Sequence, residues 1–139
     1  MRNLIEASAL LFRPIKIRVA RDTRLLRRLD LATAQPYDAL PEVIREFGLE
    51  KLTSKRPIQL YKPVPSQANP SGYYGRTTIM EFLVMTDAVR RLVMQHAGMG
   101  EIEAQARADG MRTMYEDGLV KALAGQTTIE EILRVTQEG

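Results

Sequence analysis

The sequence predicts a mainly α-helical protein with a few short strands, an α+β fold in which a compact C-terminal helical bundle follows a small irregular subdomain. In the C-terminal half, apolar residues recur with helical period. Glycines at positions 98, 110 and 125 separate these repeats, as expected where consecutive helices turn back on one another. Four of the seven prolines lie between residues 57 and 70, where they exclude a regular helix and a central strand.

The composition limits the chemistry that this chain of 139 residues can perform. With 45% hydrophobic and 27% charged residues, it resembles an ordinary folded domain. It contains no cysteine, which excludes disulfides, thiolate catalysis and Cys-ligated metal sites. No apolar run approaches the roughly 20 residues that a membrane-spanning helix needs, so we expect a cytoplasmic protein.

The first predicted domain, residues 1–36, is a basic arm of helix and strand that holds eight Lys or Arg against three Asp or Glu. Residues 3–12 predict a short helix, and the alternation over residues 15–20 predicts a strand. Residues 22–31 return to helical spacing, with leucines on one side and arginines on the other. A solvated helix face explains these arginines more simply than a binding surface does. They are Arg24, Arg27 and Arg28.

The second predicted domain, residues 37–76, has little regular structure. Residues 41–47 predict a short helix that begins with a proline and ends at Gly48. The proline-rich segment that follows predicts an extended connection, with a short strand at the sequence IQLY, residues 58–61.

The third predicted domain, residues 77–139, begins with a short strand over residues 77–85 and continues as helices. Thr86 is placed to cap the first helix, which we expect to end at Gly98. Three more helices are predicted near residues 101–109, 111–124 and 127–137, so that a four-helix unit spans residues 87–137. Thr127 and Glu130 have the T-x-x-E spacing of a capping box at the last helix.

Residue patterns that would support catalysis are absent from the sequence. There is no Gly-Lys pair, so no phosphate-binding loop of the Walker A type can form. His96 is the single histidine and has no neighbouring metal-ligand spacing. The acidic pairs, such as Glu130 and Glu131, read as solvated helix faces. The stretch GYYGRTTIMEF, residues 72–82, predicts a tight turn that enters a strand.

Two C-terminal stretches, GYYGRTTIMEFLVMTDAVRRLV and EIEAQARADGMRTMYEDGLVKALAGQTTIEEILRVT, together resemble the C-terminal region of the type II secretion and type IV pilus assembly ATPases, the general secretory pathway protein E family. The resemblance covers about residues 72–136 and is most specific from residue 111 onward. The residues that carry it there are Asp117, Gly118, Lys121, Gly125, Thr127, Thr128, Glu131, Arg134 and Val135.

The resemblance also implies a zinc-binding subdomain, held in the family by two C-x-x-C pairs that precede a G-Y-x-G-R-T-G-I pattern. The four cysteine positions correspond here to Asp30, Thr33, Pro65 and Ala68. These residues cannot supply a tetrahedral zinc site, so we expect no metal and a segment 57–70 held by packing alone. Thr78 replaces the last glycine of the pattern, which leaves the backbone geometry there open.

The Walker motifs of the family lie upstream of the region that this chain resembles, so we expect no ATP hydrolysis and no cofactor. The resemblance implies a non-catalytic C-terminal assembly and interaction module of a hexameric secretion or pilus ATPase. Its expected partners are neighbouring subunits or the ATPase core, and an inner-membrane platform protein, with the module at the cytoplasmic face of that membrane. The residues expected to make contacts are Arg24, Arg27, Arg28, Tyr73, Tyr74, Arg76 and Glu81.

A different class of function remains open from the residues alone. The chain could be a stand-alone adaptor or regulator that binds nucleic acid or an anionic surface through its basic N-terminal arm. No recognised nucleic-acid-binding motif accompanies the positive charge, so no specific nucleic acid is expected. A steep loss of binding with added salt would favour this alternative.

Overall fold

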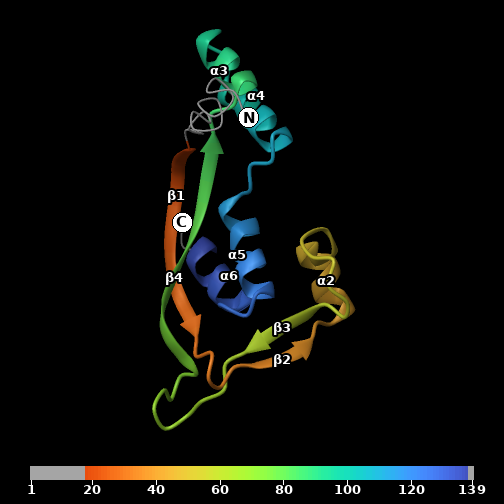
Figure 1. Cartoon of the computed structure of the whole chain (residues 1–139), viewed down its shortest axis with the longest axis vertical. Helices are drawn as coiled ribbons and strands as arrows, with labels where there is room; N and C mark the ends of the chain where they lie inside the picture. The colour runs from red at the N-terminus through yellow and green to blue at the C-terminus, as the bar shows by residue number, and fades with distance from the viewer. Residues whose placement is uncertain (1–17, 138–139) are drawn as a thin grey trace, which may run out of the picture. The chain divides into compact units, whose positions relative to one another are not determined.

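A computed structural model describes residues 18–137, and the expected helix over residues 3–12 lies outside this range. The α+β class is confirmed, with short helices accompanying two small two-stranded sheets (Figure 1). The described chain divides into two compact units. The larger comprises residues 20–82 and 112–137, and the smaller contains residues 83–111.

In the larger unit, β1 (Arg18–Leu29) pairs with β4 (Tyr73–Val84), and their arrows run in opposite directions (Figure 1). The predicted helix over residues 22–31 is therefore wrong. Leu26 and Leu29 are buried, but Leu25, which shares their side of a helix, is 56% exposed. Pairing with a strand distant in sequence has overridden a leucine spacing that suits a helix locally. The predicted turn and strand at residues 72–82 are confirmed in β4.

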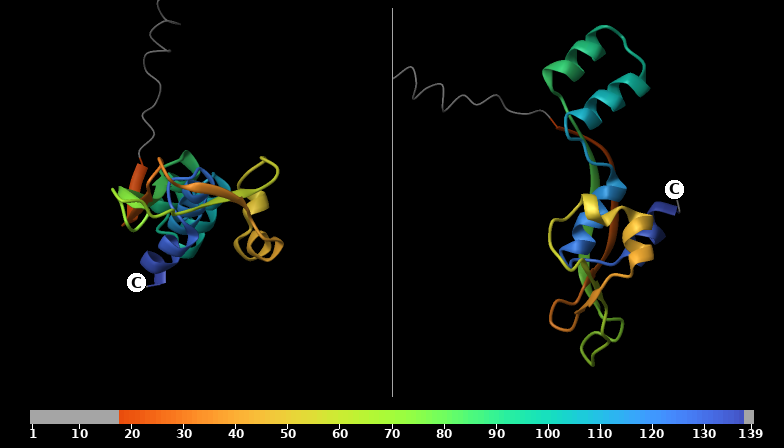
Figure 2. Two further views of the ribbon diagram at one scale, coloured as in Figure 1. Left: turned by 90° about the horizontal axis from the view of Figure 1, so that it is seen from below. Right: turned by 90° about the vertical axis from the view of Figure 1, so that its right-hand side faces the viewer.

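The second sheet joins β2 (Gln35–Asp38) to β3 (Gln59–Lys62) in antiparallel register, with Gln35 opposite Lys62. Between these strands, α2 (Pro41–Phe47) agrees with the prediction and ends at Gly48, whose φ of 63° is a left-handed conformation that glycine adopts readily. A short 3₁₀ turn, η1 (Leu49–Lys51), follows it. Figure 2 shows α2 at the end of the two-stranded ribbon that β2 and β3 form.

The last two helices, α5 (Met114–Leu123) and α6 (Ile129–Gln137), pack on each other, and α5 contacts β3. The predicted capping box is displaced by one residue. The amide of Glu131 donates to the Oγ1 of Thr128 at 3.3 Å, so Thr128 rather than Thr127 caps α6. Strands β1, β3 and β4, η1, α5 and α6 contribute to one apolar core, whose most buried members are Leu26, Leu49, Ile79, Leu119, Ala122 and Ile132.

The smaller unit contains α3 (Asp87–Met94) and α4 (Met99–Ala108), which pack against each other. Thr86 caps α3 as predicted, accepting the amide of Val89 at 3.2 Å. The helix ends at Met94, before Gly98, which instead precedes α4. None of the helices in residues 18–137 is long and apolar enough to cross a bilayer.

The four predicted C-terminal helices form as two pairs in different compact units, and not as a single bundle over residues 87–137. The core of the smaller unit contains Leu83, Val89, Ala106 and Met111. Because Met111 joins this core, the chain that follows α4 belongs with α3 and α4 as far as residue 111, and α5 belongs to the other unit.

Candidate functional site

A buried carboxylate forms the centre of a hydrogen-bonded polar cluster in the larger unit. Glu131, on α6, is only 2% exposed. Its Oε1 accepts hydrogen bonds from Nε and Nη2 of Arg27 at 3.0 and 2.8 Å, and its Oε2 accepts the Arg27 backbone amide at 2.9 Å. Arg134 adds Nη2 to Oε2 at 2.8 Å and Nε to Oε1 at 3.2 Å. We call these three residues the Glu131 clamp.

Two opposing influences set the ionisation of Glu131. Burial by itself raises the pKa of this carboxyl. The hydrogen bonds from Arg134 and Arg27 lower the pKa by more than burial raises it, and the result is a pKa of about 2. Glu131 is therefore charged and paired inside the fold, and the expectation that it lies on a solvated helix face is wrong. Both oxygens are held by guanidinium groups, and a group with so low a pKa is a poor general acid or base near neutral pH.

The cluster extends from the clamp to the start of β4. The Arg27 guanidinium stacks on the ring of Tyr73, with its Cζ 4.2 Å from the ring centroid. The Tyr73 hydroxyl lies 3.0 Å from the Thr128 hydroxyl, and burial is the main reason that the pKa of Tyr73 is raised. Thr127 donates through Oγ1 to the carbonyl of Arg27 at 2.9 Å. These contacts attach α6 to both β1 and β4.

A second cluster attaches α5 to β4. Asp117 accepts the backbone amide of Met80 at 3.0 Å, and Lys121 lies 3.3 Å from the same carboxylate. Lys121 also donates to the carbonyl of Thr78. Thr78, which stands in place of a glycine, has no left-handed φ, since His96 is the one non-glycine residue with positive φ in the described part of the chain. The substitution imposes no backbone strain.

Two glycines permit close packing between these elements. A Cβ on Gly118 would lie 3.0 Å from Cγ1 of Ile132, so α5 and α6 approach closely there. Gly125 has a φ of 81° and lies against the ring of Tyr61, 3.2 Å from where a Cβ would stand. The residues that carry the family resemblance are thus mainly those that hold the two helices to each other and to the strands.

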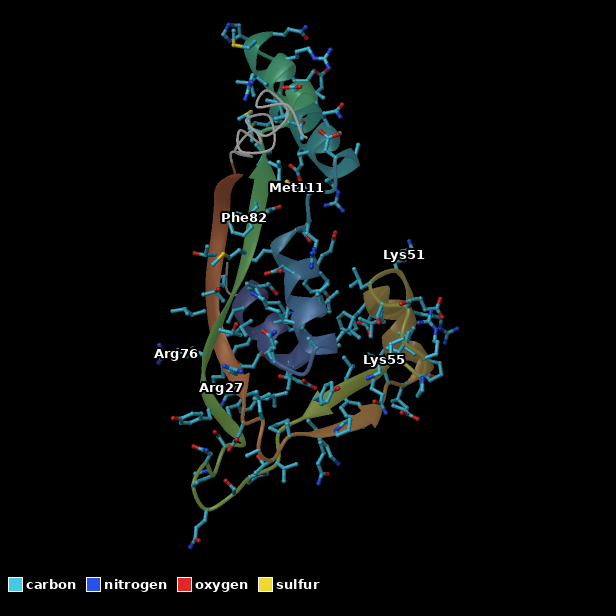
Figure 3. The ribbon with its side chains drawn as sticks, in the orientation of Figure 1. Arg27, Lys51, Lys55, Arg76, Phe82 and Met111 are labelled. Atoms are coloured by element: carbon cyan, nitrogen blue, oxygen red, sulfur yellow. The ribbon has the colours of Figure 1, made fainter. Side chains whose placement is uncertain are left out.

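Four of the predicted contact residues line two surface hollows, and the other three line neither. The first, which we call the basic hollow, has a volume of about 550 Å³ and brings Arg27 and Arg76 together beside Leu25, Leu26 and Arg134. Figure 3 shows Arg27 on β1 and Arg76 on β4, the neighbouring strand. A smaller hollow of about 260 Å³ includes Arg28 and Tyr74. Arg24, Tyr73 and Glu81 line neither hollow.

Sequence reasoning missed Glu131, Arg134 and Asp117 as residues of the site. A usable signal was present, because Thr128 and Glu131 repeat the T-x-x-E spacing one residue after Thr127 and Glu130. Choosing between the two required knowledge of which side of α6 is buried. Across residues 18–137, no cluster of three or more His, Asp or Glu side chains is arranged to hold a metal ion.

Comparison with known proteins agrees with the resemblance. A family model described as "Type II/IV secretion system protein" matches residues 1–134. Type II secretion system protein E of Xanthomonas campestris is 62% identical over 115 residues, covering 83% of this chain and 20% of that protein. The type IV pilus assembly ATPase PilB of Thermus thermophilus is 38% identical over 116 residues, and the type II secretion system ATPase E of Vibrio cholerae is 37% identical over 116. This chain spans 13% and 22% of those two proteins, respectively.

Proposed function

This chain belongs to the type II/IV secretion system protein family, and from this we propose that it acts as a non-catalytic, C-terminal assembly and interaction module of a hexameric secretion or pilus ATPase. Its partners in this proposal are neighbouring subunits or the ATPase core, together with an inner-membrane platform protein. The module would then work at the cytoplasmic face of that membrane. The relatives named as ATPases are several times longer than this chain, which leaves ample room for a separate catalytic core.

The observation that carries the proposal is the use to which the motif residues are put. The polar side chains of the motif make contacts inside the larger unit: Glu131 with Arg134, and Asp117 with Lys121 and the amide of Met80. Such contacts stabilise a surface but leave no activated nucleophile or free general base among them. A module whose most specific residues hold its own helices in place is suited to present a rigid surface to another subunit.

The basic hollow is the part of that surface with the clearest chemical character. It combines the guanidinium groups of three arginines with an exposed leucine, Leu25. Two of these arginines, Arg27 and Arg134, share the single carboxylate of Glu131. Arginine beside exposed apolar surface is common at protein interfaces, because it pairs with carboxylates while its stem packs on apolar groups. We therefore place subunit contact at this hollow, with Arg76 as its outermost test position.

The test is co-assembly. Light scattering would measure the mass of the chain alone and mixed with a nucleotide-loaded ATPase core from the same family. We expect a complex with the core that Arg76→Ala weakens by about tenfold, the effect of losing one charged interface contact. Arg45→Ala is the matched control, because Arg45 is also an exposed arginine but lies on α2 and does not line the hollow. The proposal is contradicted if the chain forms no complex with the ATPase core at any concentration tested.

The same preparation tests the absence of catalysis and the alternative function. The isolated chain should release no phosphate from ATP above the rate of a buffer control. The alternative is an adaptor or regulator that binds nucleic acid or an anionic surface through Arg21, Arg24, Arg27 and Arg28. It requires binding that falls steeply with salt. The support for this alternative is reduced because Arg27, one of those four arginines, is paired with Glu131.

A further inference from the structure

The four positions where the family resemblance implies zinc ligands do not fit a metal site. Asp30 has both carboxylate oxygens engaged: Oδ1 accepts the amide of Ala32 at 3.0 Å, and Oδ2 accepts Nδ2 of Asn69 at 2.8 Å. The Oγ1 of Thr33 is buried and has no hydrogen-bond partner in the described structure. Pro65 and Ala68 carry no side-chain donor atom at all. One occupied carboxylate and one hydroxyl cannot replace four thiolates around zinc.

We propose that a hydrogen-bonded cross-link has replaced the metal in this subdomain. The cross-link joins the loop after β1 to the loop before β4 through Asp30 and Asn69, residues that are 39 positions apart in the chain. The same two loops are joined through the backbone, because the Asp30 amide donates to the carbonyl of Gly72 at 3.0 Å. We call this pair of contacts the Asp30 bridge. It connects the two places that the family resemblance implies are joined through a metal held by paired cysteines.

Local contacts hold Asn69 in place for this role. Its backbone amide donates to the Oγ of Ser66 at 3.0 Å, and its carbonyl accepts the amides of Ser66 and Gly72 at 3.1 and 3.0 Å. The turn thus closes on itself around Asn69 and directs the side-chain amide to Asp30. The expectation that residues 57–70 are held by packing alone is wrong, since hydrogen bonds fix the end of this segment.

Gly72 completes the arrangement by allowing the chain to close. Its φ is 77°, and a Cβ there would stand 2.8 Å from both the Cβ of Pro63 and the backbone nitrogen of Val64. Only glycine accommodates both the left-handed backbone and this approach. The turn at Gly72 therefore packs closely against Pro63 and Val64, and the carbonyl of Gly72 is positioned to accept the Asp30 amide.

The bridge makes a definite physical prediction about what the subdomain depends on. A hydrogen bond to a charged acceptor, closing a long loop, restrains both loops without any metal. Their local order should therefore be insensitive to chelators and to thiol oxidants, which disable zinc–thiolate sites. The local order of the two loops should instead depend on the hydrogen bond between the Asp30 carboxylate and the Asn69 side-chain amide, so that losing either group has the same kind of effect.

Hydrogen exchange measured by mass spectrometry on the full chain provides the test. Peptides covering residues 29–34 and 66–72 should exchange at the same rate with and without EDTA. Asp30→Ala and Asn69→Ala should each raise exchange in both peptides by about tenfold, the loss expected for a hydrogen bond to a charged group. The double variant should add little to Asp30→Ala alone, because that change already removes the contact that Asn69→Ala removes.

Asp38→Ala is the matched control. Asp38 also accepts a side-chain amide, from Gln59 at 3.1 Å, but in the β2–β3 sheet and outside the two loops. Peptides from α5 report whether any variant unfolds globally, and their exchange should not change. The proposal is overturned if EDTA accelerates exchange in wild type, or if Asp30→Ala and Asn69→Ala leave both loop peptides at the wild-type rate, as Asp38→Ala should.

Discussion

At the scale of single residues, Glu131 shows how a charged side chain can be buried without becoming reactive. Its carboxylate loses contact with water, and two guanidinium groups and one backbone amide replace that contact. Both arginines remain about half exposed, at 50% and 47%, so their own loss of hydration is partial. Removing the carboxylate would leave the cations facing a polar site with no negative charge.

Glu131→Gln should therefore lower the free energy of unfolding by about 3 kcal/mol, the lower end of the range observed when one partner of a buried ion pair is removed. Urea unfolding followed by circular dichroism would measure it. Glu130→Gln is the matched control, because Glu130 is exposed, adjacent and also in the first turn of α6, so both changes remove the same favourable interaction with the helix N-terminus. Equal losses in the two variants would show that the clamp contributes nothing to stability.

The clamp should also make stability depend on pH in the acid range. The pKa of Glu131 is lowered from 4.5 to about 2 in the folded chain. Its contribution is fully present above pH 4.5 and is lost as pH falls through about 2. The stability advantage of wild type over Glu131→Gln should then shrink steadily between about pH 5 and pH 2. An advantage that stays constant over this range would show that the carboxylate has an ordinary pKa when folded.

Thr33 offers a test with the opposite sign. Its Oγ1 is buried and has no hydrogen-bond partner among the described residues, which carries an uncompensated desolvation cost. Thr33→Val keeps the shape and removes the hydroxyl, so it should stabilise the chain by about 1 kcal/mol. Thr53→Val is the control, because the Oγ1 of Thr53 accepts the amide of Lys55 and its removal should not stabilise. The midpoints of thermal unfolding would distinguish the two.

At the scale of elements, local signals identified those parts of the fold that local signals determine. The helix at residues 41–47 was predicted from its first proline and its terminal glycine, and α3 was predicted from the hydroxyl of Thr86. The strand predicted over residues 15–20 overlaps the start of β1, but the rest of β1 was missed because its leucines also match helical spacing, and only pairing with β4 distinguishes the two. Glu131 was missed for the same reason: the groups that make it a buried residue come from a strand about a hundred positions earlier.

The turn between α5 and α6 provides a test of element packing. Gly125→Ala would place a Cβ at a φ of 81° and against the Tyr61 ring, so it should destabilise by about 2 kcal/mol. Gly100→Ala should do the reverse and stabilise by about 0.5–1 kcal/mol, because Gly100 lies inside α4 with open space around it. Chemical denaturation of the two variants should show shifts of opposite sign; a neutral Gly125→Ala would mean that the turn adapts freely.

At the scale of the whole molecule, the two compact units differ in how much apolar surface they bury. Among residues 18–137, the core of the larger unit has eleven buried hydrophobic residues, contributed by strands and helices, whereas that of the smaller has four. Since each fully buried large aliphatic side chain contributes roughly 1.5–3 kcal/mol, apolar burial among the described residues stabilises the smaller unit far less than the larger one. Its helices should open in local unfolding events that leave the larger unit intact.

Hydrogen exchange should therefore be faster in α3 and α4 than in α5 and α6, by at least about tenfold at matched intrinsic rates. Val89→Ala removes a fully buried side chain from the smaller core and should accelerate exchange in residues 87–108 alone. Ile132→Ala, an equally buried change in the larger core, should instead lower the global stability and accelerate α5 and α6. If Val89→Ala accelerates exchange equally throughout residues 18–137, the chain unfolds as one cooperative unit, and the smaller core is not an independent source of stability.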